Sequence, residues 1–225
     1  MSLQLINGVF YAEFKLDNID NKALVDQITD IYLNEGKRMS DEELDIKSRP
    51  LRGLEDVDIQ HTFYEDCPIP LSTKQKFITE IKKITDNNFG ENTFTLEEIW
   101  GHFTAPLGYT MVHDHAGGGG GDYSQGYQLS WVYYPHQPKN AGDINFIATI
   151  NGGRVCHEVP IKSGCLYMFS SNILHFVPRN ASGQNRISVS GNLRASDQFI
   201  EVLREDHEFK NNYWYFSGRN ENLVG

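Results

Sequence analysis

The sequence has little cysteine, no long apolar run and no excess of positive charge. Its 225 residues include three cysteines, Cys67, Cys156 and Cys165, an odd and sparse set that argues against a disulfide framework and fits a reducing cytoplasm. No apolar run approaches the roughly 20 residues that span a bilayer, and the N-terminus lacks the basic and apolar regions of a secretory signal. The net charge of −10 disfavours nonspecific nucleic-acid binding, which requires Lys and Arg. We therefore expect a cytoplasmic protein that binds neither membranes nor duplex nucleic acid, although one buried arginine would suffice to hold a small anion.

The first ninety residues predict a hairpin and two amphipathic helices. Asn7-Gly8 suits a type I′ turn, and an alternating apolar pattern follows it. A first helix is expected from Asp20 as its cap to Gly36, and a second from Ser72, with Gln75 as a capping-box partner. Their apolar stripes predict packing against a sheet: Leu24, Val25, Ile28, Ile31 and Tyr32 in the first, and Phe77, Ile78, Ile81 and Ile84 in the second.

From Thr93 onward, short segments rich in Tyr, Val, Ile and Phe alternate with turn signals. Such spacing predicts a mainly β fold with flanking α, a double-stranded β-helix (jelly roll, cupin-like) with the helices packed outside its major sheet. We expect one domain over 1–225, with supporting elements in 1–92, the core in 93–195 and a C-terminal extension in 196–225. The aromatic run Tyr213–Phe216 predicts that this extension docks on the barrel, with an oligomer contact as the alternative. The expected strands lie around 109–115, 127–134, 143–150, 155–161, 165–170, 174–177 and 186–193.

Three histidines predict a metal centre. His113 and His115 stand at i and i+2, so in an extended chain both imidazoles point to the same face. His175 follows sixty residues after His115 and begins another expected strand. Three such ligands can hold a divalent ion on one side and leave its other positions open, as in non-haem Fe(II) enzymes. The alternative is a pair of surface or hydrogen-bonded histidines; the glycine run 117–121 that follows can be a lid or a mere linker.

An acid-binding pocket is predicted beside the metal centre. The segment 177–185 reads as a hairpin turn, so the next strand runs antiparallel and carries Arg186 and Ser188 on one face. A buried Arg is costly without a partner, and a dicarboxylic ligand supplies one, because guanidinium binds carboxylate bidentately and a nearby hydroxyl adds a hydrogen bond. A structural salt bridge is the alternative for Arg186.

Taken together, these residues resemble the 2-oxoglutarate- and Fe(II)-dependent dioxygenases, whose pattern is His-x-Asp/Glu, a distal His, and Arg-x-Ser about ten residues later. The resemblance covers roughly 109–192. Within this range the sequence is similar in detail to uncharacterised oxygenases of this family in phage and bacterial genomes. It implies that His113 and His175 bind the metal and that Arg186 and Ser188 bind the distal carboxylate of 2-oxoglutarate. By the same resemblance, Tyr109 and Tyr133 line that pocket. The segments that carry the likeness are 130–134, 142–146, 164–169 and 186–192.

The sequence departs from the family at the carboxylate position, where His115 stands in place of Asp or Glu. We prefer His115 as the third ligand. Asp114 has the wrong parity unless a bulge reverses it, and Asp122 would have to reach in from the glycine loop. The family implies Fe(II), 2-oxoglutarate and O₂ as reactants, an unknown substrate that is hydroxylated, and release of succinate and CO₂. Because three-histidine sites also occur in cupins that need no oxoacid, a cupin-like metal-binding protein or enzyme that does not use 2-oxoglutarate is the alternative.

The remaining histidines and cysteines show no ligand spacing. Cys156 and His157 are adjacent and so face opposite ways on a strand, which favours packing over a zinc site with Cys165. We interpret the other histidines as surface or satisfied core residues: His61, His102, His136 and His207.

Overall fold

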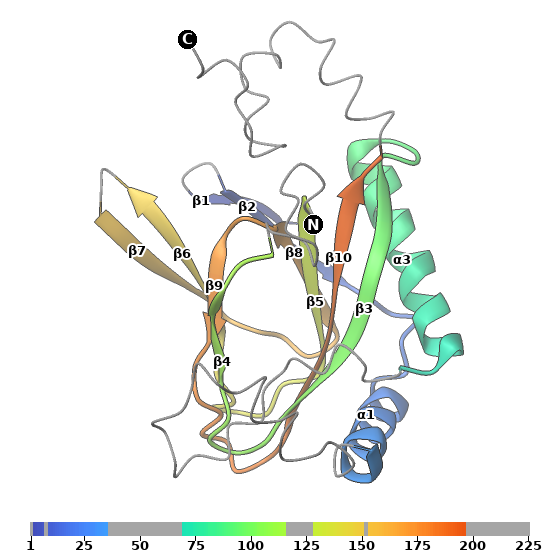
Figure 1. Ribbon diagram of the computed structural model, residues 1–225, viewed down its shortest axis with the longest axis vertical. Coiled ribbons are helices and arrows are strands. Elements are labelled where there is room, and N and C mark those ends of the chain that lie inside the picture. The colour runs from blue at the N-terminus through green and yellow to red at the C-terminus, as the bar shows by residue number, and fades with distance from the viewer. Residues whose placement is uncertain (1, 7–8, 36–68, 116–127, 151–152, 197–225) are drawn as a thin grey trace, which may run out of the picture.

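Two antiparallel sheets face each other across the interior of the protein (Figure 1). The computed structural model describes residues 2–6, 9–35, 69–115, 128–150 and 153–196. The predicted Asn7-Gly8 turn, the Gly36 helix end, Cys67, the glycine run, Asp122 and the aromatic run at 213–216 lie outside these residues. Neither described helix is long and apolar enough to cross a membrane.

The larger sheet has six strands in the order β1-β2-β8-β5-β10-β3. The N-terminal hairpin of β1 and β2 adds to its edge, because β2 pairs antiparallel with β8. This sheet therefore combines the hairpin with four strands of the core. The strand bounds are β1 Ser2–Ile6, β2 Val9–Lys15, β3 Phe94–Thr104, β5 Leu129–His136, β8 Cys165–Ser170 and β10 Arg186–Ala195.

The smaller sheet has four strands in the order β4-β9-β6-β7. Within the core, β3, β5, β8 and β10 belong to the larger sheet and β4, β6, β7 and β9 to the smaller one. The chain therefore crosses between the sheets at every connection except the β6–β7 hairpin, which is the arrangement of a double-stranded β-helix. The predicted fold class is thus confirmed, and the expected segments 165–170 and 174–177 match their strands in full. The strand bounds are β4 Thr110–His113, β6 Ile144–Ile150, β7 Gly153–Val159 and β9 Leu174–Val177.

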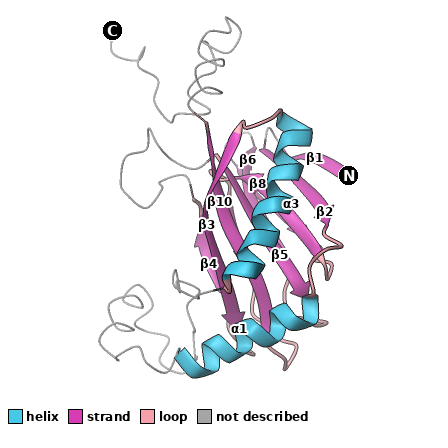
Figure 2. Cartoon of the chain, turned by 90° about the vertical axis from the view of Figure 1, so that its right-hand side faces the viewer, coloured by secondary structure: helices cyan, strands magenta, loops and turns pink. Residues whose placement is uncertain are grey.

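Two helices, α1 (Asn21–Glu35) and α3 (Leu71–Phe89), cover the outer face of the larger sheet (Figure 2). Asp20 caps α1 as predicted, since its Oδ1 accepts a hydrogen bond from the Ala23 backbone N–H at 3.0 Å. The capping box predicted at Ser72 and Gln75 is wrong. The helix starts one residue earlier, Pro70 occupies the cap position without a side-chain bond, and the backbone carbonyl of Pro70 accepts from Thr73 and Lys74.

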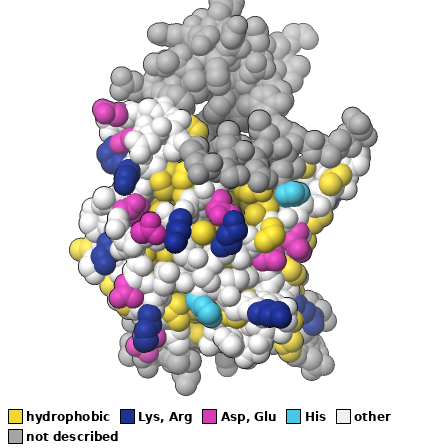
Figure 3. Space-filling view, turned by 180° about the vertical axis from the view of Figure 1, so that it is seen from behind, with side chains coloured by type: hydrophobic (Ala, Val, Ile, Leu, Met, Phe, Trp, Pro, Cys, Tyr) yellow, Lys and Arg dark blue, Asp and Glu magenta, His cyan; other side chains and the backbone are white. Residues whose placement is uncertain are grey.

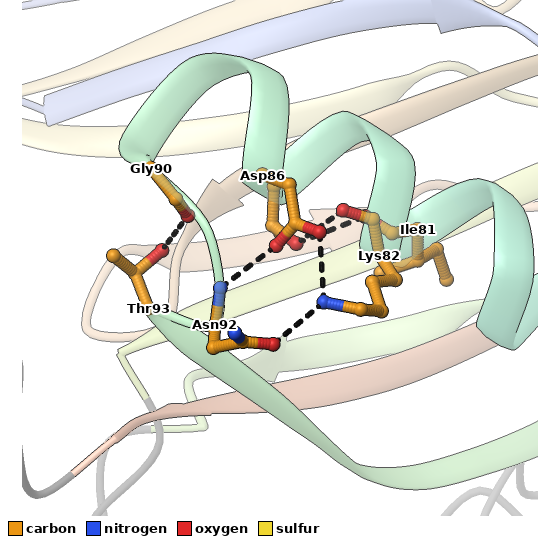
Figure 4. A network of polar contacts seen from close by, with 7 residues as sticks. Ile81, Lys82, Asp86, Gly90, Asn92 and Thr93 are labelled. Carbon is orange, nitrogen blue, oxygen red and sulfur yellow. Dashed lines mark hydrogen bonds and ion pairs between the residues drawn. The ribbon is translucent and has the colours of Figure 1, made fainter.

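A polar network fixes the turn from α3 into β3 (Figure 4). The Asp86 carboxylate accepts from Lys82 Nζ at 2.7 Å and from the Asn92 backbone N–H at 3.0 Å. Lys82 Nζ also donates to Asn92 Oδ1 at 2.9 Å, and Thr93 Oγ1 donates to the Gly90 carbonyl. Because Asn92 has a positive φ of 55°, the turn is tight, and it directs the chain straight into β3.

The larger sheet is buried on both faces, so alternate residues of the same strand belong to different cores. Along β5, Trp131 and Tyr133 pack against the helices, with Phe77 stacked on Trp131 at 5.5 Å. Val132 and Tyr134 belong instead to the cluster between the two sheets. The inner face of β10 is polar, and its residues are buried: Arg186, Ser188, Ser190 and Asn192.

Charged side chains of both signs share the surface. Seen from behind, Lys and Arg side chains lie among Asp and Glu side chains over the part of that face that the structure describes (Figure 3). Basic and acidic side chains are therefore interspersed on the described part of this face.

Candidate metal centre

The three predicted histidines meet on the inner face of the smaller sheet. His113, the last residue of β4, lies directly opposite His175 on β9, and Phe146 on β6 lies opposite His175 on its other side. His115 follows two residues after His113, and its backbone N–H donates to the Ser171 carbonyl at 2.8 Å. One ligand atom from each of the three imidazoles lies within 4.8 Å of the others. Among the described residues, these histidines form the group of donor atoms that could hold a metal ion.

Backbone carbonyls orient two of the three rings. Nδ1 of His113 lies 2.7 Å from the Met111 carbonyl oxygen, and Nδ1 of His175 lies 3.0 Å from that of Ile173. Because a carbonyl oxygen can only accept, Nδ1 carries the proton in each neutral ring and Nε2 keeps its lone pair. Hydrogen bonds of this kind are common around metal-binding histidines, since they fix the tautomer that coordinates.

Burial keeps the three imidazoles neutral. It lowers the pKa of His113, lowers the pKa of His115 to about 4, and lowers the pKa of His175 well below its usual value. Repulsion among the three rings acts in the same direction for His115 and His175. A metal ion requires neutral imidazole, so no proton has to be displaced from these rings at pH 7.

The donor set fits a divalent transition metal. Metal–imidazole bonds are about 2.1 Å long, so three ligand atoms on one face of an ion stand about 3 Å apart, and a small inward movement of the rings would complete the site. Asp114 between the two ligands is exposed, as its parity predicts, although the β4–β9 register shifts between Thr110 and His113. We therefore place His115 rather than Asp114 in the group.

Trp100 and His102 on β3 complete one wall of the site. The Trp100 ring stacks on His115 with centroids 5.9 Å apart and planes at 23°. Its indole Nε1–H donates to Nε2 of His102 at 2.6 Å. Burial, with smaller contributions from the charges of His113, Arg186 and His115, lowers the pKa of His102 to about 3. His102 thus lies within electrostatic reach of both the histidine group and Arg186.

Arg186 is buried without an acidic partner among the described residues. Its side chain is 2% exposed, and its hydrogen bonds run from Nη1 to the carbonyls of Ala141 at 2.5 Å and Pro178 at 3.3 Å. Burial lowers the pKa of Arg186, but a guanidinium remains protonated at pH 7. A buried cation that meets only neutral dipoles is costly, so this position favours an anionic ligand over the structural salt bridge.

Gly142 and Tyr134 shape the surroundings of the guanidinium. Gly142 has φ +90°, and a Cβ there would stand 3.2 Å from Nη1 of Arg186. Tyr134 lies on the inner face of β5; burial raises its pKa to about 12, while the charge of Arg186 lowers it. A protonated phenol beside a guanidinium offers a second donor to the same anion.

Solved structures share this architecture. The epimerase SnoN in complex with Fe³⁺, alpha ketoglutarate and nogalamycin RO superposes with a TM-score of 0.54 at 13% identity, over 82% of this chain and 78% of that one. The carbocyclase SnoK from nogalamycin biosynthesis gives 0.53 at 12% identity, over 83% and 80%. The viral collagen prolyl hydroxylase of Paramecium Bursaria Chlorella virus-1 gives 0.50 at 14% identity, over 85% and 92%.

This protein has the fold of the 2-oxoglutarate- and Fe(II)-dependent oxygenases. The chain spans 59% of the length of a 2OG-Fe(II) oxygenase family oxidoreductase from Burkholderia pseudomallei, with a TM-score of 0.45. No protein-family model matches the sequence, and no curated protein matches it.

Within this oxygenase fold, the predicted site residues separate into two groups. Ser188 is buried on the inner face of β10, two residues from Arg186. Tyr133 lies on the opposite face of its sheet, where its hydroxyl donates to Asn21 Oδ1 and its ring packs edge-on against Phe77. The structure therefore separates Tyr133 from the histidines, whereas its neighbour Tyr134 faces the interior within electrostatic reach of Arg186. Tyr109, one residue before β4, is partly buried, and its role at the oxoacid stays a prediction.

Two residues of this wall, Trp100 and His102, are not indicated by local sequence patterns, because neither stands at ligand spacing to another histidine. The expectation that His102 is a surface or satisfied core histidine does not capture its place beside the three-histidine group. The available signal was parity: Trp100 and His102 stand at i and i+2 on a strand, so they share a face. Which face that is depends on the pairing of β3 with β10, where Trp100 lies opposite Ser190 and His102 opposite Ser188.

The residues considered for zinc do not meet. Cys156 on β7 is exposed and donates from Sγ to Asn145 Oδ1 at 3.2 Å, whereas Cys165 is buried at the start of β8. His157 instead packs its ring near Tyr11. Among the described residues these three do not form a group of donor atoms that could hold a metal ion.

Proposed function

We propose that this protein is an Fe(II)- and 2-oxoglutarate-dependent dioxygenase that hydroxylates a substrate with release of succinate and CO₂. The observation that supports it best is the pairing of two features on facing sheets. One is a three-histidine group in which backbone carbonyls orient the rings of His113 and His175, and the other is a buried arginine that has no acidic partner among the described residues. A dicarboxylate that binds a metal at one end needs a cation at the other, and this barrel provides both.

In this proposal the protein residues bind and orient. His113, His115 and His175 hold the metal from one side and leave its opposite side to the co-substrates. Arg186 and Ser188, with Tyr134 beside them, receive the distal carboxylate of 2-oxoglutarate. When bound, the iron and the oxoacid supply the oxidising chemistry, while the protein positions the reactants and excludes water.

The test is formation of succinate from 2-oxoglutarate with Fe(II) and O₂, without added substrate. We expect slow, metal-dependent turnover that Arg186→Ala abolishes. Loss of two hydrogen bonds to a charged group, at about 1.5–3 kcal/mol each, weakens 2-oxoglutarate binding by roughly 100-fold or more. The matched control is Arg154→Ala, which removes an exposed arginine on β7 and should leave turnover unchanged. Absence of succinate from a folded, metal-loaded protein would contradict the proposal.

The three-histidine donor set favours one competing function, a cupin-like metal protein or enzyme that does not use 2-oxoglutarate. Calorimetry separates the two. The oxygenase binds 2-oxoglutarate only when metal is present, because the metal supplies half of the oxoacid site. The cupin-like protein binds metal and shows no metal-dependent affinity for the oxoacid.

A further inference from the structure

The hydrogen bond between Trp100 and His102 determines where the proton of His102 resides. Indole Nε1–H is a donor and cannot accept. Since it donates to Nε2 of His102 at 2.6 Å, that nitrogen must offer its lone pair. The imidazole is therefore neutral and carries its single N–H at Nδ1.

This Nδ1–H has no acceptor among the described residues, although the atom is buried. Buried donors in native proteins are almost always hydrogen-bonded, and an unpaired one costs about 1–3 kcal/mol. Structural and surface histidines do not need such an arrangement. A donor that is buried, fixed in one tautomer and left without a partner indicates a ligand that supplies the acceptor.

The position of His102 identifies that ligand's chemistry. Along the β3–β10 ladder, Thr104 lies opposite Arg186, His102 opposite Ser188, and Trp100, which contacts His115, opposite Ser190. His102 thus stands one step from the guanidinium toward the histidine group. It remains outside the set of three metal-ligating histidines, and its Nε2 is engaged by Trp100.

The length of 2-oxoglutarate is comparable with the two-residue advance along β10 from Arg186 to Ser188, the partner of His102. Two residues along a strand advance roughly 6.6 Å. The carboxyl carbons of an extended five-carbon diacid lie about 5 Å apart with standard carbon–carbon bonds. A diacid held at its far end by the Arg186 side chain is therefore long enough to span the step along the ladder from Arg186 to His102, on the side of the histidine group.

We propose that His102 donates a hydrogen bond from Nδ1 to the metal-side carboxylate of 2-oxoglutarate, and that Trp100 holds the imidazole in the tautomer that allows it. This assignment rests on the oxygenase function proposed above. His102 is then an oxoacid-binding residue, and Trp100 is a positioning residue that contacts both His102 and the ligand His115.

Two amide substitutions distinguish the roles of the two ring nitrogens of His102. His102→Gln places an acceptor near the former Nε2, which keeps a partner for Trp100 but removes the donor at Nδ1. His102→Asn places its amide N–H₂ near the former Nδ1, which keeps the donor. Trp100→Phe keeps an aromatic ring against His115 but removes the N–H that fixes the tautomer.

The measurement is calorimetric titration of each protein with Fe(II) alone, and then of the Fe(II)-loaded protein with 2-oxoglutarate, both under anaerobic conditions so that nothing turns over. We expect His102→Gln to weaken 2-oxoglutarate binding by roughly 10- to 100-fold, the range for a hydrogen bond to a charged group, with Fe(II) affinity unchanged. His102→Asn should stay within about threefold of the parent protein, and Trp100→Phe should fall between the two.

Each outcome decides the assignment. Weak binding by the Gln variant with rescue by the Asn variant supports it. Equal loss of 2-oxoglutarate affinity in both variants overturns it, because the position would then need the imidazole ring for packing rather than a donor. Undiminished binding by the Gln variant also overturns it. If the unmodified protein shows no metal-dependent 2-oxoglutarate binding, the proposed function fails and the role of His102 fails with it. Circular dichroism of each variant shows that the fold is intact.

Discussion

Gly142 allows a direct test of how the protein holds Arg186. Its φ of +90° lies in the region that side chains other than glycine rarely adopt, and a Cβ there would stand 2.7 Å from the Pro178 carbonyl oxygen and 3.2 Å from Nη1 of Arg186. That carbonyl accepts a hydrogen bond from Arg186, as does the carbonyl of Ala141, the residue before Gly142. An added methyl group would therefore crowd the Pro178 carbonyl and the guanidinium of Arg186.

The expected cost of Gly142→Ala has two parts. The left-handed conformation costs an L-residue about 1–2 kcal/mol, and crowding in a packed site adds typically 1–3 kcal/mol. Gly183 provides a matched control: it lies in the same β9–β10 connection as Pro178, has φ +73°, and a Cβ there meets no atom within 4 Å. Gly183→Ala should thus show the conformational part alone, about 1–2 kcal/mol.

Urea unfolding of both variants measures the free energy of unfolding, and calorimetry with metal present measures 2-oxoglutarate affinity. We expect Gly142→Ala to be the less stable of the two by at least about 1 kcal/mol and to bind 2-oxoglutarate more weakly, while Gly183→Ala binds normally. Equal destabilisation in the two variants, together with equal affinity for the oxoacid, would refute the argument that Gly142 makes room for the guanidinium.

Three further results are expected. His175→Ala should abolish metal binding in calorimetry, whereas Asp114→Asn should leave it unchanged; loss of metal in the Asp114 variant would reverse our choice of third ligand. Tyr134→Phe should weaken 2-oxoglutarate binding severalfold, while Tyr133→Phe should cost about 1 kcal/mol of stability through its lost hydrogen bond and leave affinity alone; the opposite pattern would contradict the strand parity. The metal-free protein should lose stability as the pH falls from about 6.5 toward about 4, the pKa of His115. The unfolded chain takes up protons in this window and the folded site does not, so unfolding midpoints that stay constant between pH 7.5 and pH 4.5 would disprove the linkage.

Local patterns predicted what depends on alternation within one strand. His113 and His115 share a face because they stand two residues apart, and Arg186 and Ser188 share the inner face of β10 for the same reason. The fold class followed from the regular spacing of short apolar segments. These features depend on the two-residue alternation of side chains along a strand, which can be read directly from the sequence.

What escaped prediction depends on which face of a strand turns inward. Along β5 both faces are buried, so its apolar run shows no alternation to distinguish Tyr133 from Tyr134, and a resemblance pointed to the wrong neighbour. His102 was missed because its significance comes from pairing with a strand more than eighty residues away in sequence. Pairings of this kind are decided by the assembled barrel rather than by neighbouring residues.

The double burial of the larger sheet also bears on how such a protein can change over time. Along most of β10 and β5, even-numbered residues face the interior between the two sheets and odd-numbered residues pack against the helices. A lineage could therefore exchange inward-facing residues and acquire a new specificity while the framework behind them stays untouched. A mutational library aimed at a new substrate should vary the inward-facing positions other than Arg186, Ser188 and Tyr134 and leave the helix-facing positions intact.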